Sequence, residues 1–366
     1  MISLRTMMMR GGTSAGVYLL KSDLDETGLD PDVLLSVILG SLDRRQIDQL
    51  GGDSATTSKV AIVGPSTRPD CDVDYLFAQV DLATLWVDRT VTCGNLLAGV
   101  GPFAIERGLI ETISPCTAVR VHLVNTGATV TVSVATPGGF LRYDGDCQIT
   151  GVAGQAVPID LMFSNFCGGR TGKVFPTGHP VDHVGDVAIT AIDAGVCAII
   201  ARAREFGITG GESPQQLNDD GELLHRLERL RLRAALAMGL GGSHGYVLPK
   251  VMLVSESDCA DVRSRYFVPG RCDAGHTVSG AVCLATAGAF CDTVAGRLLA
   301  HPFDTGPTVL EHPAGTMSID ISHAGDSDFG ICAAVHSTAR KLFDGYVFAD
   351  MHREPCLIGA VEAGVT

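Results

Sequence analysis

Positive charge is scarce in this sequence of 366 residues, which has 27 Lys and Arg against 41 Asp and Glu and a formal charge of −14. Proteins that bind nucleic acid by neutralising phosphates need the opposite balance, so we expect no nucleic-acid partner. Charged residues make up only 19% of the chain, below the usual share of about 25%. Glycine is abundant by contrast, with 44 residues. A chain of this length is expected to form about two domains, each with a substantial core.

Long apolar runs and paired cysteines are also missing. Nowhere do about 18 apolar residues follow one another, as a membrane-spanning helix requires, so no membrane partner is expected. Residues 1–12 lack the apolar stretch and cleavage site of a secretory signal. The 12 cysteines are dispersed and form no Cys-x-x-Cys pair. We therefore expect a cytoplasmic, reduced protein whose cysteines are mostly small buried hydrophobic residues.

Local patterns predict both strands and helices. Alternation with period two predicts half-buried strands at residues 130–134 and 317–321. Asn125-Thr126-Gly127 predicts a hairpin turn before the first of these strands. A helix is predicted from the N-cap Asp30 to the stop signal Gly40, and a longer amphipathic helix from about residue 219 to 238.

Two further stretches, residues 94–106 and 279–290, are apolar nearly all round and rich in small residues. Such helices need protein on every side. Similar strings, 59–63 and 250–254, precede them at comparable distances, which indicates an internal repeat of β-structure around a central helix, although chance similarity is an alternative. The periodicity breaks around Pro176–Pro180. We therefore expect domains at residues 1–180 and 181–366, with a return of the last residues to the first domain left open.

Glycine-rich segments are the first candidates for a binding site. In Arg10–Gly16, successive backbone N–H groups can form a cradle for an anion. The segment has neither the Walker order nor the dinucleotide-binding fingerprint. A second cluster, Gly51–Ser54, lies just before Lys59. Ordinary structural turns are the alternative for both segments.

Cys93 and Lys59 are candidates for acid–base chemistry. Cys93 opens the first buried helix, where the positive end of the helix dipole favours a thiolate, and Gly94-Asn95 would let a carboxylate reach the free N–H groups. A core cysteine is the alternative. Lys59 begins an otherwise apolar strand, so its amine either faces solvent or lies in apolar surroundings that favour the neutral, basic form. The sequence leaves both possibilities open.

A metal site is not expected. The chain has no His-x3-His helix pair and no Cys-x2–4-Cys spacing, and Pro180 interrupts the pair His179 and His183.

An ordered string of motifs resembles the PrpF family, most closely its 4-oxalomesaconate tautomerase/isomerase branch. The motifs cover nearly the whole chain: Arg10–Ser14, Arg45–Asp48 with Gly51-Gly52, Ser58–Val60, Asp72–Phe77, Cys93–Ala104, Asn125–Gly127, Pro176–Gly178, Pro249-Lys250, Arg271-Cys272, Glu311–Pro313 and Thr338–Gly345.

The resemblance implies an α+β fold of the diaminopimelate-epimerase type, with two similar domains and an active site in the cleft between them. It implies proton transfer on a conjugated di- or tricarboxylate without metal or organic cofactor, with Lys59 as the expected base and Cys93 as the second candidate. Backbone groups around Thr277–Gly280, at the start of the second buried helix, are expected to assist. The expected substrate contacts are Arg10, Gly11, Gly12, Thr13, Ser14, Gly52, Ser54, Gly94, Asn95, Arg271, Ser279 and Gly280.

One departure affects the expected substrate. The family loop usually reads Thr-Ser-Lys-Gly, whereas this chain has Ala15 in place of the lysine. The alternatives are therefore a family member acting on 2-methylaconitate, aconitate or 3-methylitaconate, a two-base racemase using Cys272 and Cys283, or a binding protein that retains the cleft. The expected partner is a small polycarboxylate, and a homodimer is one possible assembly.

Overall fold

The computed structural model describes residues 1–40, 46–52, 54, 56–81, 86–241, 247–268, 270–299, 306–323 and 330–351. Contacts divide the chain into two compact units. Unit 1 comprises Met1–Asn125, Thr129–Leu161 and the described part of Ser337–Thr366, and unit 2 comprises Thr126–Ala128 and Met162–His336. The sequence suggested a division at residue 180, but the break in periodicity there is a series of turns inside unit 2.

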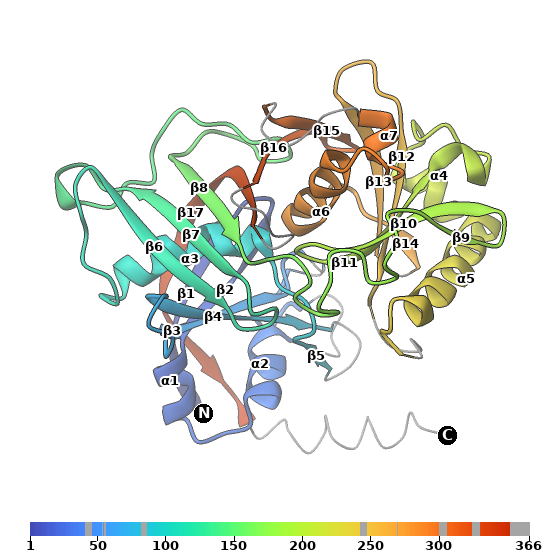
Figure 1. The fold of residues 1–366 in the computed structure, drawn as a ribbon. Helices are drawn as coiled ribbons and strands as arrows, with labels where there is room; N and C mark the ends of the chain where they lie inside the picture. Colours follow the sequence, from blue (N-terminus) through green and yellow to red (C-terminus); the bar gives the residue numbers. More distant parts are fainter. Residues whose placement is uncertain are drawn as a thin grey trace. The chain divides into compact units, whose positions relative to one another are not determined.

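Unit 1 is a β-structure around one central helix (Figure 1). Its elements are β1 (Ile2–Gly11), β2 (Ser14–Leu20), α1 (Lys21–Glu26), α2 (Pro31–Leu39), β3 (Lys59–Pro65), β4 (Val73–Val80), β5 (Val87–Asp88), α3 (Gly94–Glu106), β6 (Cys116–Leu123), β7 (Thr129–Ala135) and η1 (Pro137–Gly139). Two strands contribute residues to both units, β8 (Pro158–Ser164) and β17 (Ile331–Ala349). Residues 339–349 of β17 pair with β1, which explains why the end of the described chain belongs to unit 1.

Unit 2 is also built of strands and helices, with α6 as its central helix. Its elements are β9 (Asp182–Val184), β10 (Val187–Asp193), β11 (Cys197–Arg202), η2 (Ala203–Phe206), α4 (Pro214–Asp219), α5 (Gly221–Ala237), β12 (Lys250–Ser255), β13 (Val262–Val268), β14 (Arg271–Cys272), α6 (Val278–Ala289), α7 (Gly296–Leu299), β15 (Thr308–His312) and β16 (Gly315–His323).

The strand pairings confirm the internal repeat. In unit 1, β1 and β2 form a hairpin, β2 and β3 are parallel, β3 and β4 are antiparallel, β4 and β6 are parallel, and β6 and β7 form a hairpin. In unit 2 the strands β10, β11, β12, β13, β15 and β16 repeat this order of pairings. Lys59 and Lys250 begin the corresponding strands β3 and β12, as the two similar strings in the sequence indicated.

The central helices are enclosed, as their composition predicted. α3 contacts β1, β2, β3, β4, β6 and β7, and α6 contacts β10, β11 and β16 (Figure 1). Every residue of α3 from Leu96 to Ala104 is buried, and so is every residue of α6 from Val278 to Gly288. Gly99 allows this packing because a Cβ there would lie 2.4 Å from the hydroxyl of Tyr18. The small residues thus let strands approach each helix closely.

The other two predicted helices are also present, and most of α2 is buried. α2 begins at the predicted N-cap, where the Asp30 carboxylate accepts from the N–H of Asp32 at 2.8 Å, and it ends at Gly40 in the left-handed conformation. The longer predicted helix is α5, capped by Asp220. None of the helices in the described ranges combines the length and the apolar character needed to cross a bilayer.

Candidate active site

The predicted glycine loop is a tight hairpin turn. β1 ends at Gly11 and β2 begins at Ser14, so Gly12 and Thr13 alone form the turn. Gly12 has a φ of 51°, in the left-handed region that glycine adopts readily. Its N–H donates to the carbonyl of Thr338 at 2.9 Å. The expected anion cradle therefore loses this N–H group to a bond within the protein.

Arg10 holds the turn from the end of β1. Its Nη1 donates to the carbonyl of Gly12 at 2.9 Å, and to the carbonyl and hydroxyl of Thr338 at 3.0 and 2.9 Å. Burial, together with the nearby Arg340, lowers the pKa of the Arg10 guanidinium from its usual value. Arg10 was predicted to bind a substrate carboxylate, but the Nη1 group of its guanidinium holds the turn in place instead.

The turn packs directly against the start of α3. A Cβ on Gly11 would lie 2.4 Å from the carbonyl oxygen of Asn95, closer than real Cβ atoms approach. The side-chain amide of Asn95 donates to the hydroxyl of Thr13 at 3.0 Å and to that of Ser14 at 3.4 Å. The structure therefore brings together the predicted residues of the hairpin and of the helix start, and glycine is needed there for close packing.

Cys93 occupies the predicted position at the helix N-terminus. It is the N-cap of α3, and its Sγ accepts from the N–H of Leu96 at 3.5 Å. The side chain is 9% exposed, and the Cys93 carbonyl accepts from the hydroxyl of Tyr75 at 3.2 Å. The first N–H groups of α3, from Gly94 and Asn95 on, carry the positive end of the helix dipole. This end of α3 is suited to stabilise negative charge.

The second glycine cluster leads into a helical turn. The carbonyl of Ser54 accepts from the N–H groups of Thr57 and Ser58 at 3.1 and 3.0 Å. A Cβ on Gly52 would lie 2.7 Å from the Thr57 hydroxyl. The Ala15 N–H donates to the carbonyl of Thr56 at 3.1 Å, so this turn adjoins the hairpin. Asp53 of the predicted cluster and Arg45 of the motif before it lie outside the described residues.

Lys59 follows this turn and is half-buried. It pairs with Gly16 on parallel β2 and with Gln79 on antiparallel β4. Its Nζ donates to Oε1 of Gln79 at 2.8 Å and lies 5.2 Å from the centroid of the Phe77 ring. The sequence had offered a solvent-facing amine or an apolar environment. The structure shows a half-buried lysine whose amine contacts both an aromatic ring and a neutral hydrogen-bond acceptor.

Gln79 is a residue that the sequence analysis did not identify. A signal was present, since residues 73, 75 and 77 of the same strand face are apolar or aromatic and are buried, and a polar residue continues this face at position 79. Its connection with Lys59 depends on pairing between strands, which no local pattern reveals.

The other predicted residues lie in unit 2. Thr277 is the N-cap of α6, and its hydroxyl accepts from the N–H of Gly280 at 3.1 Å. Ser279 is 8% exposed, and a Cβ on Gly280 would lie 2.6 Å from the ring of Tyr266. Arg271, by contrast, is exposed on β14. By its place in the repeat, Thr277 corresponds to Cys93.

A buried histidine precedes this helix start. His276 has its Nε2 3.3 Å from the Ser264 hydroxyl and its Nδ1 3.1 Å from the Thr277 carbonyl. Burial lowers the pKa of His276 to about 3, with a smaller effect of His312 in the same direction. The imidazole is thus neutral near pH 7.

The two cysteines considered for a racemase are poorly suited to that role. Burial raises the pKa of Cys272 to about 12, and it raises the pKa of Cys283 well above its usual value. Cys283 lies inside α6 rather than at its start. Both thiols are therefore protonated near neutral pH, and neither occupies the N-cap position that Cys93 has in unit 1.

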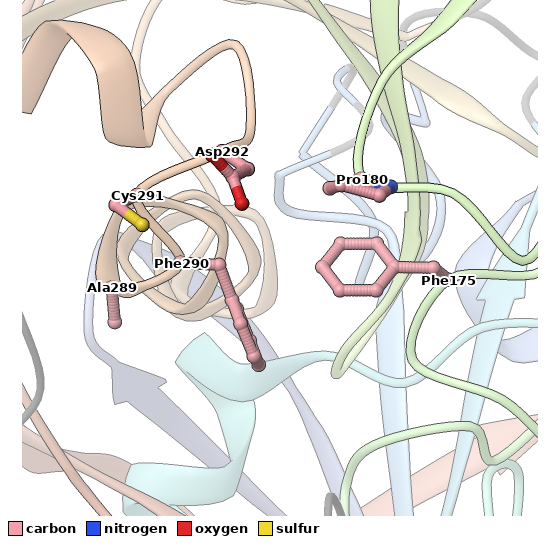
Figure 2. Close-up of a pocket in the computed structure, with 6 residues that line it drawn as sticks. All are labelled: Phe175, Pro180, Ala289, Phe290, Cys291 and Asp292. Carbon is pink, nitrogen blue, oxygen red and sulfur yellow. The ribbon is translucent and has the colours of Figure 1, made fainter.

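A pocket in unit 2 contains none of the predicted site residues. Phe175 and Phe290 line it with their rings edge to face and the ring centroids 5.1 Å apart, and Asp292 is also among the lining residues (Figure 2). It lies at the C-terminal end of α6, the negative end of the helix dipole. An apolar pocket with a carboxylate at this position is unsuited to an anionic substrate. Within the described ranges, no cluster of three or more His, Cys, Asp or Glu is arranged to hold a metal ion.

Two units of similar topology, each with strands around a central helix, define an α+β fold of the diaminopimelate-epimerase type. The solved structure of a methylitaconate-delta-isomerase matches with a TM-score of 0.81 and 32% identity, covering 96% of this chain and 97% of that chain. A family model described as PrpF protein matches residues 1–350, and the chain belongs to the PrpF family.

Curated relatives support the same assignment. The chain is 42% identical to the 4-oxalomesaconate tautomerase of Pseudomonas putida, over 93% of this chain and 94% of that protein. It is also 42% identical to the (4E)-oxalomesaconate Delta-isomerase of Novosphingobium sp. strain KA1, over 93% of this chain and 96% of that protein. The chain is therefore an enzyme of the isomerase class.

Proposed function

We propose that this enzyme isomerises 4-oxalomesaconate by moving a proton along its conjugated system. The observation that carries the proposal is the amine of the half-buried Lys59, whose hydrogen-bond partner is the neutral Gln79. A neutral partner leaves the amine able to act as a base, and a side chain held by an acceptor is oriented for proton transfer. The 42% identity to two proteins named for oxalomesaconate supports this substrate over methylitaconate, for which the solved structure at 32% identity is named.

The reaction consists of two proton transfers. Neutral Lys59 removes a proton from the carbon next to the conjugated system, so that the C–H electron pair enters a delocalised dienolate. Lys59 or Cys93 then returns a proton to a different carbon, and the double bond shifts. The product has the same atoms as the substrate. If Lys59 returns the proton, the neutral amine is regenerated directly. If Cys93 returns it, the thiolate regains a proton from the Lys59 ammonium, directly or through water, before the next turnover.

Negative charge on the intermediate is stabilised by N–H groups of the protein. Those at the start of α3 point out of the helix and are already oriented before the reaction. The hydroxyls of Thr13 and Ser14 lie beside them, held by Asn95. We propose that these groups bind one carboxylate of the substrate.

Ala15 is the residue that favours an alternative substrate. The family loop usually has a lysine at this position. If that lysine helps to hold a substrate carboxylate, its replacement by Ala15 favours 2-methylaconitate, aconitate or 3-methylitaconate as the alternative substrate.

Proton exchange distinguishes these possibilities. The enzyme is incubated in D2O with 4-oxalomesaconate and, separately, with each alternative, and isomer formation and deuterium uptake are followed by NMR. We expect the fastest exchange and isomerisation with 4-oxalomesaconate. Faster reaction of another acid would transfer the assignment to that acid, and absence of exchange with all of them would favour a binding protein.

A further inference from the structure

Gln79 is held at both ends of its side-chain amide. Its Nε2 donates to the carbonyl of Ser58 at 2.8 Å and approaches that of Val80 at 3.4 Å. Both of these partners are acceptors, so the amide nitrogen must face them and the amide oxygen must face Lys59. The orientation of Gln79 is therefore determined by the backbone of its own strand and of Ser58, the residue before β3, and the oxygen stays directed at the Lys59 amine.

Ser58 extends this connection into the core. Its hydroxyl donates to Oε1 of Gln46 at 3.0 Å, and Nε2 of Gln46 donates to the carbonyl of Leu39 at the end of α2. Both Ser58 and Gln46 are buried, with exposures of 0% and 2%. Gly51 makes room for the Gln46 amide, since a Cβ there would lie 2.1 Å from its Nε2. A continuous chain of hydrogen bonds thus runs from α2 through Gln46, Ser58 and Gln79 to Lys59.

The neutral amide matters for the chemistry of a base. An amide oxygen accepts a hydrogen bond from a neutral amine as well as from an ammonium, so it can orient Lys59 throughout a cycle of proton transfer. A carboxylate at this position would hold the ammonium form through its charge. Glutamine therefore fixes the direction of the amine without trapping its proton.

We propose that Gln79 is a positioning residue, which orients the Lys59 amine for proton abstraction and keeps it free of a negatively charged partner. The proposal rests on the proposed function in that Lys59 acts as the base. It goes beyond that function because it assigns to Gln79, and to the chain of bonds behind it, a role that neither the motifs nor the family match assigns.

Two substitutions at Gln79 separate orientation from charge. Gln79→Met keeps the length of the side chain and removes its hydrogen bonds, and we expect kcat to fall by about 10- to 100-fold with KM changed less than about threefold. Gln79→Glu adds a negative charge, and we expect the rising limb of the rate–pH profile to move upward by about one pH unit or more. Activity of Gln79→Glu therefore recovers at higher pH, whereas that of Gln79→Met does not.

The matched control is Gln148→Glu, which adds the same charge at an exposed position of unit 1. It should leave kcat and the pH profile as in the wild type. A purely structural role of Gln79 would lower thermal stability and activity in both Gln79 variants without the selective recovery at high pH. That outcome, or wild-type kinetics in both variants, overturns the proposal.

A second measurement does not depend on turnover. Reductive methylation with formaldehyde modifies only neutral amines, so the extent of Lys59 methylation against pH, measured by mass spectrometry, reports the proton on this side chain. We expect the curve to shift to higher pH in Gln79→Glu and not in Gln148→Glu. An unshifted curve contradicts the proposal even if no substrate is turned over. Conversely, full activity of Lys59→Ala would refute Lys59 as the base, whatever the methylation shows.

Discussion

At the residue scale, the two candidate acid–base residues, Lys59 and Cys93, lie in different surroundings. Lys59 extends from a strand and is held at 2.8 Å by an amide from the neighbouring strand. Cys93 ends a loop and caps a helix, with its sulfur 3.5 Å from a helix N–H. The Lys59 amine is thus oriented by the side chain of Gln79, and the Cys93 thiol by an N–H group at the start of α3.

Replacement of Lys59 tests its proposed role as the base. Lys59→Ala should lower kcat by about 10² to 10⁴-fold, the usual contribution of a general acid–base group, and leave the far-UV circular dichroism spectrum unchanged. The fold should survive because Lys59 is the first residue of β3 and only half-buried. Turnover close to that of the wild type would exclude Lys59 as the base.

Replacement of the thiol tests whether one group or two carry the proton. If Cys93 returns the proton, Cys93→Ser should lower kcat by at least about tenfold, because serine is a far weaker acid, yet it can still cap the helix. The comparison of isomerisation and of deuterium exchange in the same variant locates the affected step. Unchanged values of both would leave Lys59 as the single acid–base residue.

At the scale of elements, the glycines of the hairpin allow neighbouring strands and a helix to pack closely. The sequence suggested that they leave N–H groups open to an anion, but the structure shows strands and a helix meeting at van der Waals distance. Gly16 is an example, because a Cβ there would lie 2.6 Å from the carbonyl oxygen of its neighbour Lys59 and 2.9 Å from Leu96. The hairpin, β3 and α3 can adjoin one another only if this position has no side chain.

Gly16→Ala should therefore affect stability and activity together. The added methyl group pushes β2 away from Lys59, and we expect a loss of about 1–3 kcal/mol in the free energy of unfolding, measured with urea, and a reduced kcat. Gly221→Ala on α5 is the matched control, since no atom lies within 4 Å of the corresponding Cβ. It should be neutral or slightly stabilising. Equal effects of the two substitutions would contradict this account.

Local signals correctly located the elements that they predicted. The cap at Asp30, the hairpin turn at Asn125–Gly127 and the uniformly apolar stretch at 94–106 all depend on neighbouring residues, and each lies where it was predicted. The strand β1 was missed because residues 2–11 lack clear alternation: its buried residues include Thr6 and Gly11, and its ladder with β17 joins the two ends of the described chain. Long-range pairing stabilises a segment that its own composition does not define.

At the scale of the whole molecule, stability depends on pH through buried histidines. The pKa of His276 is about 3 in the folded state and 6.5 in the unfolded chain, so the unfolded chain binds more protons between these values. The stabilisation is complete above about pH 6.5 and is lost progressively as the pH falls toward 3. Burial also lowers the pKa of His312, which acts in the same direction.

Urea unfolding at pH 7.5 and pH 5 measures this effect. Neutral His276 should account for about 2 kcal/mol of the stability that the wild type loses between these pH values. His276→Gln, which cannot be protonated, should lose correspondingly less, although it is less stable at pH 7.5. His225→Gln on the exposed face of α5 is the control and should behave as the wild type. An identical pH dependence in His276→Gln would show that another group is responsible.

The sequence by itself determined the two enclosed helices, the repeated strand strings and the position of Cys93 at a helix start, because each depends on residue types close together in the chain. Its ordered motifs also indicated the family. Only the tertiary structure decided how the amine of Lys59 is held, because Gln79 is 20 residues away and reaches it through an antiparallel pairing. The same holds for Arg10, whose guanidinium is fastened to Thr338 at a separation of 328 residues. Contacts between distant segments depend on strand register and packing, which arise from the folded chain as a whole.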